Sequence, residues 1–204
     1  GEPVGVGAAS GDHYEKVTSA LDDWSGRYLI VYENGSSAYV FDGSLSKLDA
    51  SNNYISASIT NSKISWTDEL EKSEFSIEKA GSGYDILSAS GNYIYRSATS
   101  NGLNTASSSP SQKNQISFNA DTDSSSVRIS SNDKVTLQFN SAKDQMRFRF
   151  FASSQQPIQL YKYVSGTTLP DFDRLELSGT FTTDYFEGDS LNLAGMAVTV
   201  FSVS

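Results

Sequence analysis

Acidic side chains are the main candidates for chemistry in this chain, because it contains one histidine and no cysteine. His13 stands beside Asp12 in what we expect to be a loose N-terminal segment, so neither a Ser-His-Asp triad nor a metal site of several His or Cys ligands can be assembled. The clustered carboxylates, such as Asp68 with Glu69 and Glu71, fall in polar stretches that resemble turns. Glycoside hydrolysis needs two acids facing one cleft. We therefore expect no catalytic residue, no metal ligand and no cofactor.

Aromatic side chains among amides are the remaining candidates for function, since binding pockets combine apolar walls with a few hydrogen-bonding groups. The first predicted ligand-binding set is Tyr93, Tyr95, Asn92, Asn101 and Asn104. Successive strand residues point to opposite faces, so Tyr93 and Tyr95 share one face. The second predicted set is Trp66 with Asp68. Packing in the core or across strands is the alternative role for both sets.

Charge and composition limit the classes of partner that we expect for this chain. The 204 residues carry a formal net charge of −9 without the basic stripe of a nucleic-acid-binding surface, so we expect no nucleic-acid partner. No segment approaches the roughly 18 apolar residues of a spanning helix, so we expect no direct insertion into a membrane. Many Ser, Thr, Asn and Gly residues, with 11 Tyr, 11 Phe and only 2 Met, are typical of an all-β extracellular module.

The elements that must position these residues follow a recurring order of strand, tight turn and strand. Residues 26–32 read as a strand, Asn34-Gly35 as a hairpin turn, and residues 38–41 as the returning strand. The same order recurs over residues 84–97 and again over residues 126–139. Residues 54–59 and 63–66, with a turn at Asn61, are predicted to be a hairpin inserted into the first unit.

Apolar pairs in the closing strands repeat with a nearly constant spacing. They begin at Phe75, Ile116 and Ile158, which lie 41 and 42 residues apart. This period indicates an internal repeat. Three four-strand units over residues 13–164 resemble a β-trefoil, with another β-barrel or a two-sheet sandwich as the alternatives. In that architecture we expect Ile30, Ile86 and Ile129 to meet in one core.

The sequence pattern changes after a predicted linker at residues 165–170. Residues 171–204 contain a strand ending in Ser178-Gly179, a Tyr-x-x-Gly-Asp segment at residues 185–189 and a Gly-Met-x-Val-Thr segment at residues 195–199. These motifs resemble the first part of a bacterial immunoglobulin-like domain. We expect the strand edges of this fragment to pair with the first domain or with another copy. Residues 1–12 are predicted to be a flexible leader or tag remnant.

Together these features predict a non-catalytic binding module of a secreted or cell-surface bacterial protein, with a glycan or another surface ligand as its partner. Ricin-like trefoil lectins carry Gln-x-Trp in each repeat, whereas this chain has Gln115-Ile116-Ser117 and Gln156-Pro157-Ile158. The ricin mode of sugar binding is therefore not expected. A spacer or assembly module without a small ligand is the first alternative, and a carboxylate-based hydrolase is the second.

Overall fold

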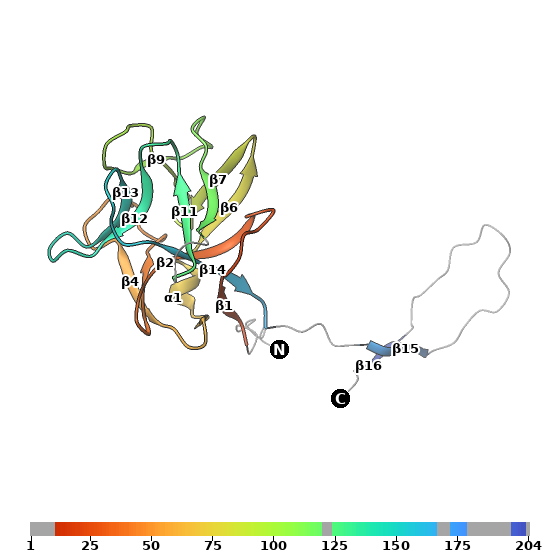
Figure 1. The fold of residues 1–204 in the computed structure, drawn as a ribbon. Coiled ribbons are helices and arrows are strands. Elements are labelled where there is room, and N and C mark those ends of the chain that lie inside the picture. The colour runs from red at the N-terminus through yellow and green to blue at the C-terminus, as the bar shows by residue number, and fades with distance from the viewer. Residues whose placement is uncertain (1–10, 120–123, 167–171, 179–196, 203–204) are drawn as a thin grey trace. The chain divides into compact units, whose positions relative to one another are not determined.

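The computed structural model describes residues 11–119, 124–166, 172–178 and 197–202. The chain divides into two compact units, residues 1–166 and residues 167–204. The described residues form sixteen strands and one short helix, and all the strand pairs are antiparallel. The prediction of an all-β protein is therefore confirmed (Figure 1).

The first sequence unit supplies four strands, and the first of them pairs with both the second and the fourth. They are β2 (Gly26–Asn34), β3 (Ser37–Phe41), β4 (Tyr54–Ser58) and β6 (Phe75–Ala80). The predicted hairpin joins β2 and β3, but its two turn residues are Gly35, at a φ of 64°, and Ser36, because Asn34 is still paired with Ser37. β3 pairs along its length with β4, from Phe41 opposite Tyr54 to Ser37 opposite Ser58.

The predicted inserted hairpin was placed wrongly, because β4 is the regular third strand of its unit. The insertion is instead β5 (Lys63–Ser65) and α1 (Asp68–Glu71). β5 pairs with β1 (His13–Lys16), which also pairs with the last strand of the first compact unit. The alternation of apolar and polar residues predicts these strands but not which strands they pair with, because the partners can be distant in the chain. His13 consequently lies in a strand, and the expectation of a loose segment there was wrong.

The other two sequence units have the same order of elements. The second consists of β7 (Gly83–Ser88), β8 (Tyr93–Tyr95), β9 (Asn104–Ala106) and β10 (Gln115–Asn119). The third consists of β11 (Ser126–Ser130), β12 (Thr136–Asn140), β13 (Arg147–Phe151) and β14 (Gln159–Val164). Within each unit the middle two strands pair with each other.

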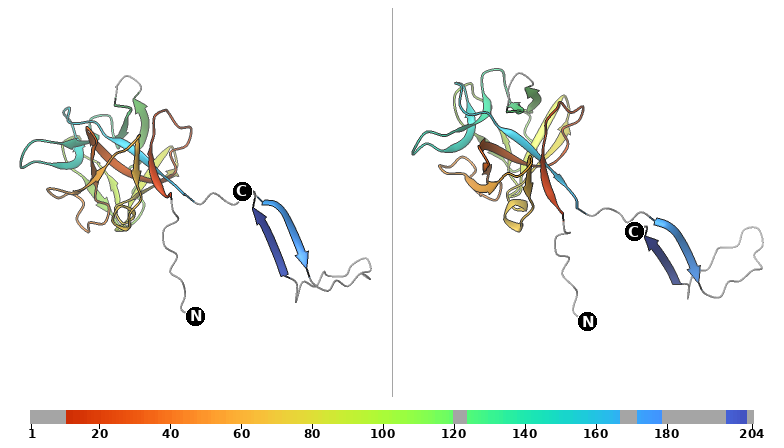
Figure 2. Two further views of the ribbon diagram at one scale, coloured as in Figure 1. Left: turned by 90° about the horizontal axis from the view of Figure 1, so that it is seen from below. Right: turned by 60° about the horizontal axis from the view of Figure 1, so that its bottom comes forward.

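The main sheet has the strand order β5-β1-β14-β2-β6-β7-β8-β9, with β3 joined to β2 and β4 joined to β3. The continuous ladders do not close into a barrel, because β10–β11 and β12–β13 are separate two-stranded sheets. Isolated bridges connect Tyr84 of β7 to Asn114 and Val127 of β11 to Ile158, so the separate β10–β11 pair is joined on both sides. Figure 2 shows β1 and β14 running side by side at the edge of this unit.

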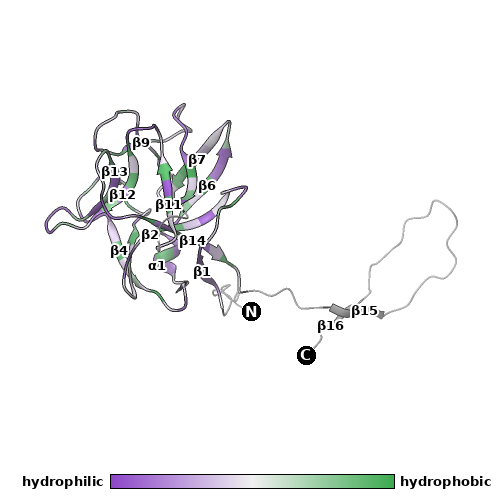
Figure 3. Ribbon diagram, in the orientation of Figure 1, coloured by the Kyte–Doolittle hydropathy of each residue, from purple (hydrophilic) through white to green (hydrophobic). Residues whose placement is uncertain are grey.

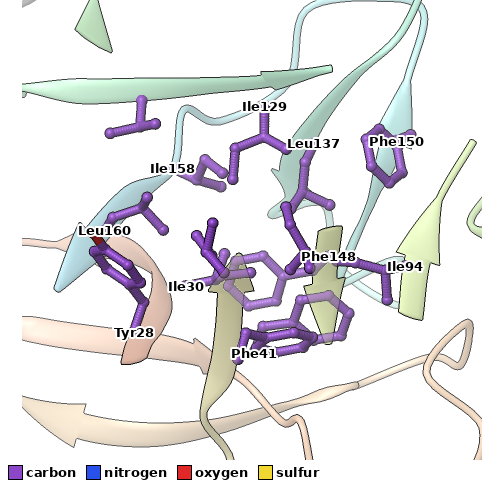
Figure 4. Close-up of a cluster of buried hydrophobic side chains, with 14 of the residues drawn as sticks. Tyr28, Ile30, Phe41, Ile94, Ile129, Leu137, Phe148, Phe150, Ile158 and Leu160 are labelled. Atoms are coloured by element: carbon purple, nitrogen blue, oxygen red, sulfur yellow. The ribbon is translucent and has the colours of Figure 1, made fainter. Parts of the chain in front are cut away.

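The largest apolar cluster joins all three sequence units. Ile30, Ile86 and Ile129 are fully buried members of it, as the sequence predicts. Figure 4 shows Ile30, Ile129 and Ile158 converging with aromatic rings from other strands. Apolar and polar residues alternate along many strands in Figure 3, so each strand directs one face inward.

A second cluster covers the opposite face of β2. Leu29 and Val31 belong to this cluster, whereas Tyr28 and Ile30 belong to the first. β2 is thus buried on both faces, which explains its nearly continuous apolar sequence. The inserted elements supply Ile64 and Leu70 to the second cluster, and β1 and β14 supply Tyr14 and Tyr161.

The second compact unit contains an antiparallel pair, β15 (Phe172–Ser178) and β16 (Ala197–Ser202). The predicted Tyr-x-x-Gly-Asp segment lies outside the described residues, as do residues 1–10. Among the residues described, no helix is both long and apolar enough to span a membrane.

Candidate functional site

The predicted tyrosine pair occupies the outer face of β8. Tyr93 and Tyr95 are half-buried, while Ile94 between them is fully buried in the large cluster. The expected shared face is therefore confirmed. Tyr95 lies opposite Asn104 across the β8–β9 ladder, so these members of the predicted set are neighbours.

The asparagines of this set bond to the protein itself. Asn104 Oδ1 accepts hydrogen bonds from the Ser97 backbone N–H at 3.2 Å and from Arg96 Nη1 at 3.3 Å. Asn101 Oδ1 accepts from the Ala152 N–H at 2.8 Å, and Asn92 donates to Ser90 at 3.2 Å. These amides therefore order the loops that flank β8 and β9. Tyr93 and Tyr95 are the members of the set that present aromatic side chains on this face.

The second predicted set lies at the inserted helix. Trp66 is half-buried and packs against the second cluster. Asp68 is the first residue of α1, so the expectation of a polar turn was wrong at this position. Thr67 caps the helix by accepting a hydrogen bond from the Leu70 N–H at 3.1 Å. Three carboxylates in the first turn interact favourably with the positive N-terminal end of the helix dipole.

A pocket of about 540 Å³ lies beside this helix, and we call it the β4–β5–α1 pocket. It is lined by His13, Ser56, Ala57, Ser58, Thr60, Asn61, Lys63, Ile64, Ser65, Thr67, Glu69 and Leu70. Trp66 and Asp68 are absent from this lining, although their neighbours Ser65, Thr67 and Glu69 belong to it. The second predicted set thus lies beside this pocket in the chain, but its two side chains do not line it.

The pocket combines an apolar base with a polar rim. Ile64 and Leu70 are buried at its base, and half-buried Ala57 supplies accessible apolar surface. Neither the Lys63 ammonium nor the Glu69 carboxylate has a side-chain partner among the described residues, and both residues are exposed. Asn61 and Ser62, both at positive φ, form the tight turn beside it, closed by the Thr60 N–H to Lys63 carbonyl bond of 2.9 Å.

A partly buried ionic network joins α1 and β1, which contribute residues to this pocket, to β2 and β14 of the main sheet. Glu74 is 7% exposed, and its carboxylate accepts from Tyr14 Oη at 2.5 Å and from Arg27 Nε at 2.7 Å. Arg27 Nη2 also bonds to Glu74 at 2.8 Å and to Glu71 at 3.0 Å. The Arg27 guanidinium further lies 4.0 Å from the centre of the Tyr163 ring. β1, β2, β14 and α1 are thereby joined at one point.

The protonation states in this network follow from burial and from the hydrogen bonds to Glu74. Burial, together with the hydrogen bond to Glu74, raises the pKa of the Tyr14 hydroxyl, so it remains a donor. The hydrogen bond to Glu74 raises the pKa of Arg27, which stays charged. Glu71 and Glu74 are thus occupied by one guanidinium instead of facing an open cleft as a catalytic pair would. Their arrangement supports a structural role.

The imidazole of His13, which also lines the pocket, is oriented by two contacts. Its Nδ1 lies 2.8 Å from the Gly11 carbonyl oxygen, so Nδ1 carries the proton and donates. Its Nε2 lies 3.3 Å from Glu15. Asp12, predicted to belong to the leader, accepts hydrogen bonds from Tyr163 Oη at 3.1 Å and from the Gly166 N–H at 2.6 Å. Asp12 is therefore bonded to the domain and is not part of a free leader.

Sequence reasoning did not single out the hydroxyl-bearing residues of β4 and β5. Ser56 and Ser58 alternate with Ala57, and this was the available signal for a polar strand face. No family model, curated protein or solved structure gave a significant match to the chain. Function is therefore inferred from the geometry of the site.

Proposed function

We propose that the first compact unit is a non-catalytic binding module that takes a glycan in the β4–β5–α1 pocket. The observation that carries this proposal is the lining, in which hydroxyl, amide and charged groups surround an apolar base. Hydroxyl groups both donate and accept hydrogen bonds, as sugar hydroxyls do. Ala57 is the apolar lining residue that keeps exposed surface and can contact the apolar face of a sugar ring, while Lys63 and Glu69 bond to its hydroxyl groups.

The proposed architecture is a β-trefoil, in which β2, β6, β7, β10, β11 and β14 are the barrel strands. The pairings β14–β2, β2–β6, β6–β7 and β10–β11 support this order. The isolated bridges at Tyr84–Asn114 and Val127–Ile158 supply the remaining two junctions. The hairpins β3–β4, β8–β9 and β12–β13 are then the cap.

The proposed setting is a secreted or cell-surface bacterial protein. Its support is the resemblance of residues 171–204 to the start of a bacterial immunoglobulin-like domain. Of the three segments that carry this resemblance, the first and the third include β15 and β16, which pair with Leu177 opposite Val198. Fold analogy is a weak argument for function by itself, so the binding proposal stands on the pocket.

A glycan array probed with the full chain tests this proposal. The variant Ser58→Trp places an indole in the pocket mouth, and Ser108→Trp adds the same side chain to an exposed loop position outside the pocket lining. We expect neutral glycans to bind to the wild type and to Ser108→Trp but not to Ser58→Trp. A silent array would refute glycan binding and favour the spacer alternative. Equal binding by both variants would show that this pocket is not the site.

A further inference from the structure

Arg128 differs from the other arginines of the first compact unit. It lies at the centre of β11 with an exposed side chain, and it has no ion pair or hydrogen bond from that side chain among the described residues. The other four arginines each bond to a protein side chain: Arg27 to Glu74, Arg96 to Ser100, Arg147 to Ser51 and Arg149 to Asp49. Packing of the described residues therefore gives no reason for a guanidinium at position 128.

Three adjoining hollows meet at Arg128, and we call them together the Arg128 groove. Their volumes are about 530, 400 and 240 Å³. Arg128 lines all three, Asp133 lines the first and third, and Gln138 lines the second and third. Serine, threonine, asparagine and glutamine side chains make up most of the remaining lining.

The groove has a local excess of positive charge although the chain has a net charge of −9. Among the described residues, its lining contains the cations Lys113, Arg128 and Lys134 and one carboxylate, Asp133. Lys113 is paired with Asp85 at 2.8 Å, and Lys134 with Asp133 at 3.2 Å. Arg128 is therefore the cation of the groove whose charge has no partner among the described residues.

We propose that the Arg128 groove binds a carboxylate-bearing polysaccharide. The planar guanidinium presents paired N–H donors that match the two oxygens of a carboxylate. The hydroxyl and amide groups along the groove can bond to the sugar hydroxyls on either side of that carboxylate. A nucleic acid is a poorer fit, because it needs several cations along its backbone and aromatic rings for stacking, and the groove offers one uncompensated cation.

Binding of the full chain to defined polymers tests this second site. Polygalacturonate, alginate and hyaluronate are the carboxylate probes, and methyl-esterified polygalacturonate and dextran are the uncharged controls. We expect at least one of the three carboxylate polymers to bind, and the uncharged controls not to bind. Failure of all three overturns the proposal. Equal binding of polyglutamate or dextran sulfate also overturns it, because the groove would then recognise negative charge without recognising a uronate.

Matched variants assign the binding to Arg128. Arg128→Gln and Lys143→Gln remove one positive charge each, and Lys143 is an exposed residue outside the groove lining. We expect Arg128→Gln to weaken polyuronate binding by about tenfold or more and Lys143→Gln to change it by less than about twofold. Arg128→Lys keeps the charge without the paired donors and should lie between them. Equal losses in the two glutamine variants overturn the assignment.

The groove and the β4–β5–α1 pocket share no lining residue. The Ser58→Trp variant should therefore bind polyuronate as the wild type does, and Arg128→Gln should retain any neutral glycan found on the array. These two results separate failure of the second site from failure of the proposed function. Loss of polyuronate binding in Ser58→Trp would contradict a site centred on Arg128.

Discussion

Replacement of Glu74 by glutamine should strongly destabilise the first compact unit. The substitution keeps the shape of the side chain but replaces one acceptor oxygen by an NH₂ group and removes the charge. Three hydrogen bonds end on this carboxylate, from Tyr14 Oη and from two nitrogens of Arg27. In the variant at least one of these donors has no acceptor, next to a tyrosine that is fully buried.

The expected loss is about 3 kcal/mol of unfolding free energy. Hydrogen bonds to charged groups contribute roughly 1.5–3 kcal/mol each. The Arg27 side chain is 39% exposed and keeps Glu71 as a partner, so its share is reduced by solvent. For a domain of this size, the loss corresponds to a fall in Tm of roughly 6–12 °C.

Urea unfolding followed by tryptophan fluorescence measures this change. Both tryptophans, Trp24 and Trp66, lie in the first compact unit, so the signal reports on that unit alone. Glu71→Gln is the matched control, because Glu71 bonds to the same arginine with a side chain that is 47% exposed, and its loss should stay below about 1 kcal/mol. If Glu74→Gln unfolds at the same urea concentration as Glu71→Gln, the buried network does not stabilise the fold.

Three further predictions concern buried polar groups. Tyr28→Phe should change the unfolding free energy at neutral pH by less than about 1 kcal/mol, because the buried Tyr28 hydroxyl has no partner among the described residues; a larger loss in urea would reveal a missing bond. Burial raises the pKa of Tyr28 to about 12 and also raises the pKa values of Tyr14 and Tyr161. The unfolding free energy that is present below pH 10 should therefore fall as the pH rises from about 10 towards 12. Urea midpoints measured across that range should fall less in Tyr28→Phe than in the wild type. Asn53→Ala should lower the unfolding free energy, measured by thermal or urea unfolding, by about 3 kcal/mol. The reason is that fully buried Asn53 accepts a hydrogen bond from the Phe148 N–H at 2.8 Å and donates one to the Phe148 carbonyl at 2.9 Å. A loss below about 1 kcal/mol would contradict this anchoring role.

Much of the local structure could be predicted from the sequence. The Asn34-Gly35 turn and the spacing from Phe75 to Ile116 and Ile158 indicate hairpins and a repeat, because both depend on contacts close in the chain or on a regular period. The shared outer face of Tyr93 and Tyr95 follows from strand alternation alone. These features survive in the structure because tertiary contacts do not oppose them.

The candidate site could not be predicted to the same degree. Segments distant in the chain form the β4–β5–α1 pocket, and pairing of β1 with β5 brings His13 opposite Ser65. The period of the sequence contains no information on that pairing, since β1 lies before the first repeat. Trp66 appeared to be a binding platform as an aromatic residue among polar ones, yet it packs against the second cluster.

The sequence alone determined the all-β class, the repeating strand order and the lack of cysteine ligands, because these depend on residue type and spacing. Only the tertiary structure decided which polar groups are available to a ligand. Arg147 and Arg149 look like Arg128 in sequence, yet Ser51 bonds to Arg147, Asp49 bonds to Arg149, and no described residue bonds to the Arg128 side chain. Whether a charge is neutralised depends on side chains up to about 100 residues away, and folding alone brings those together.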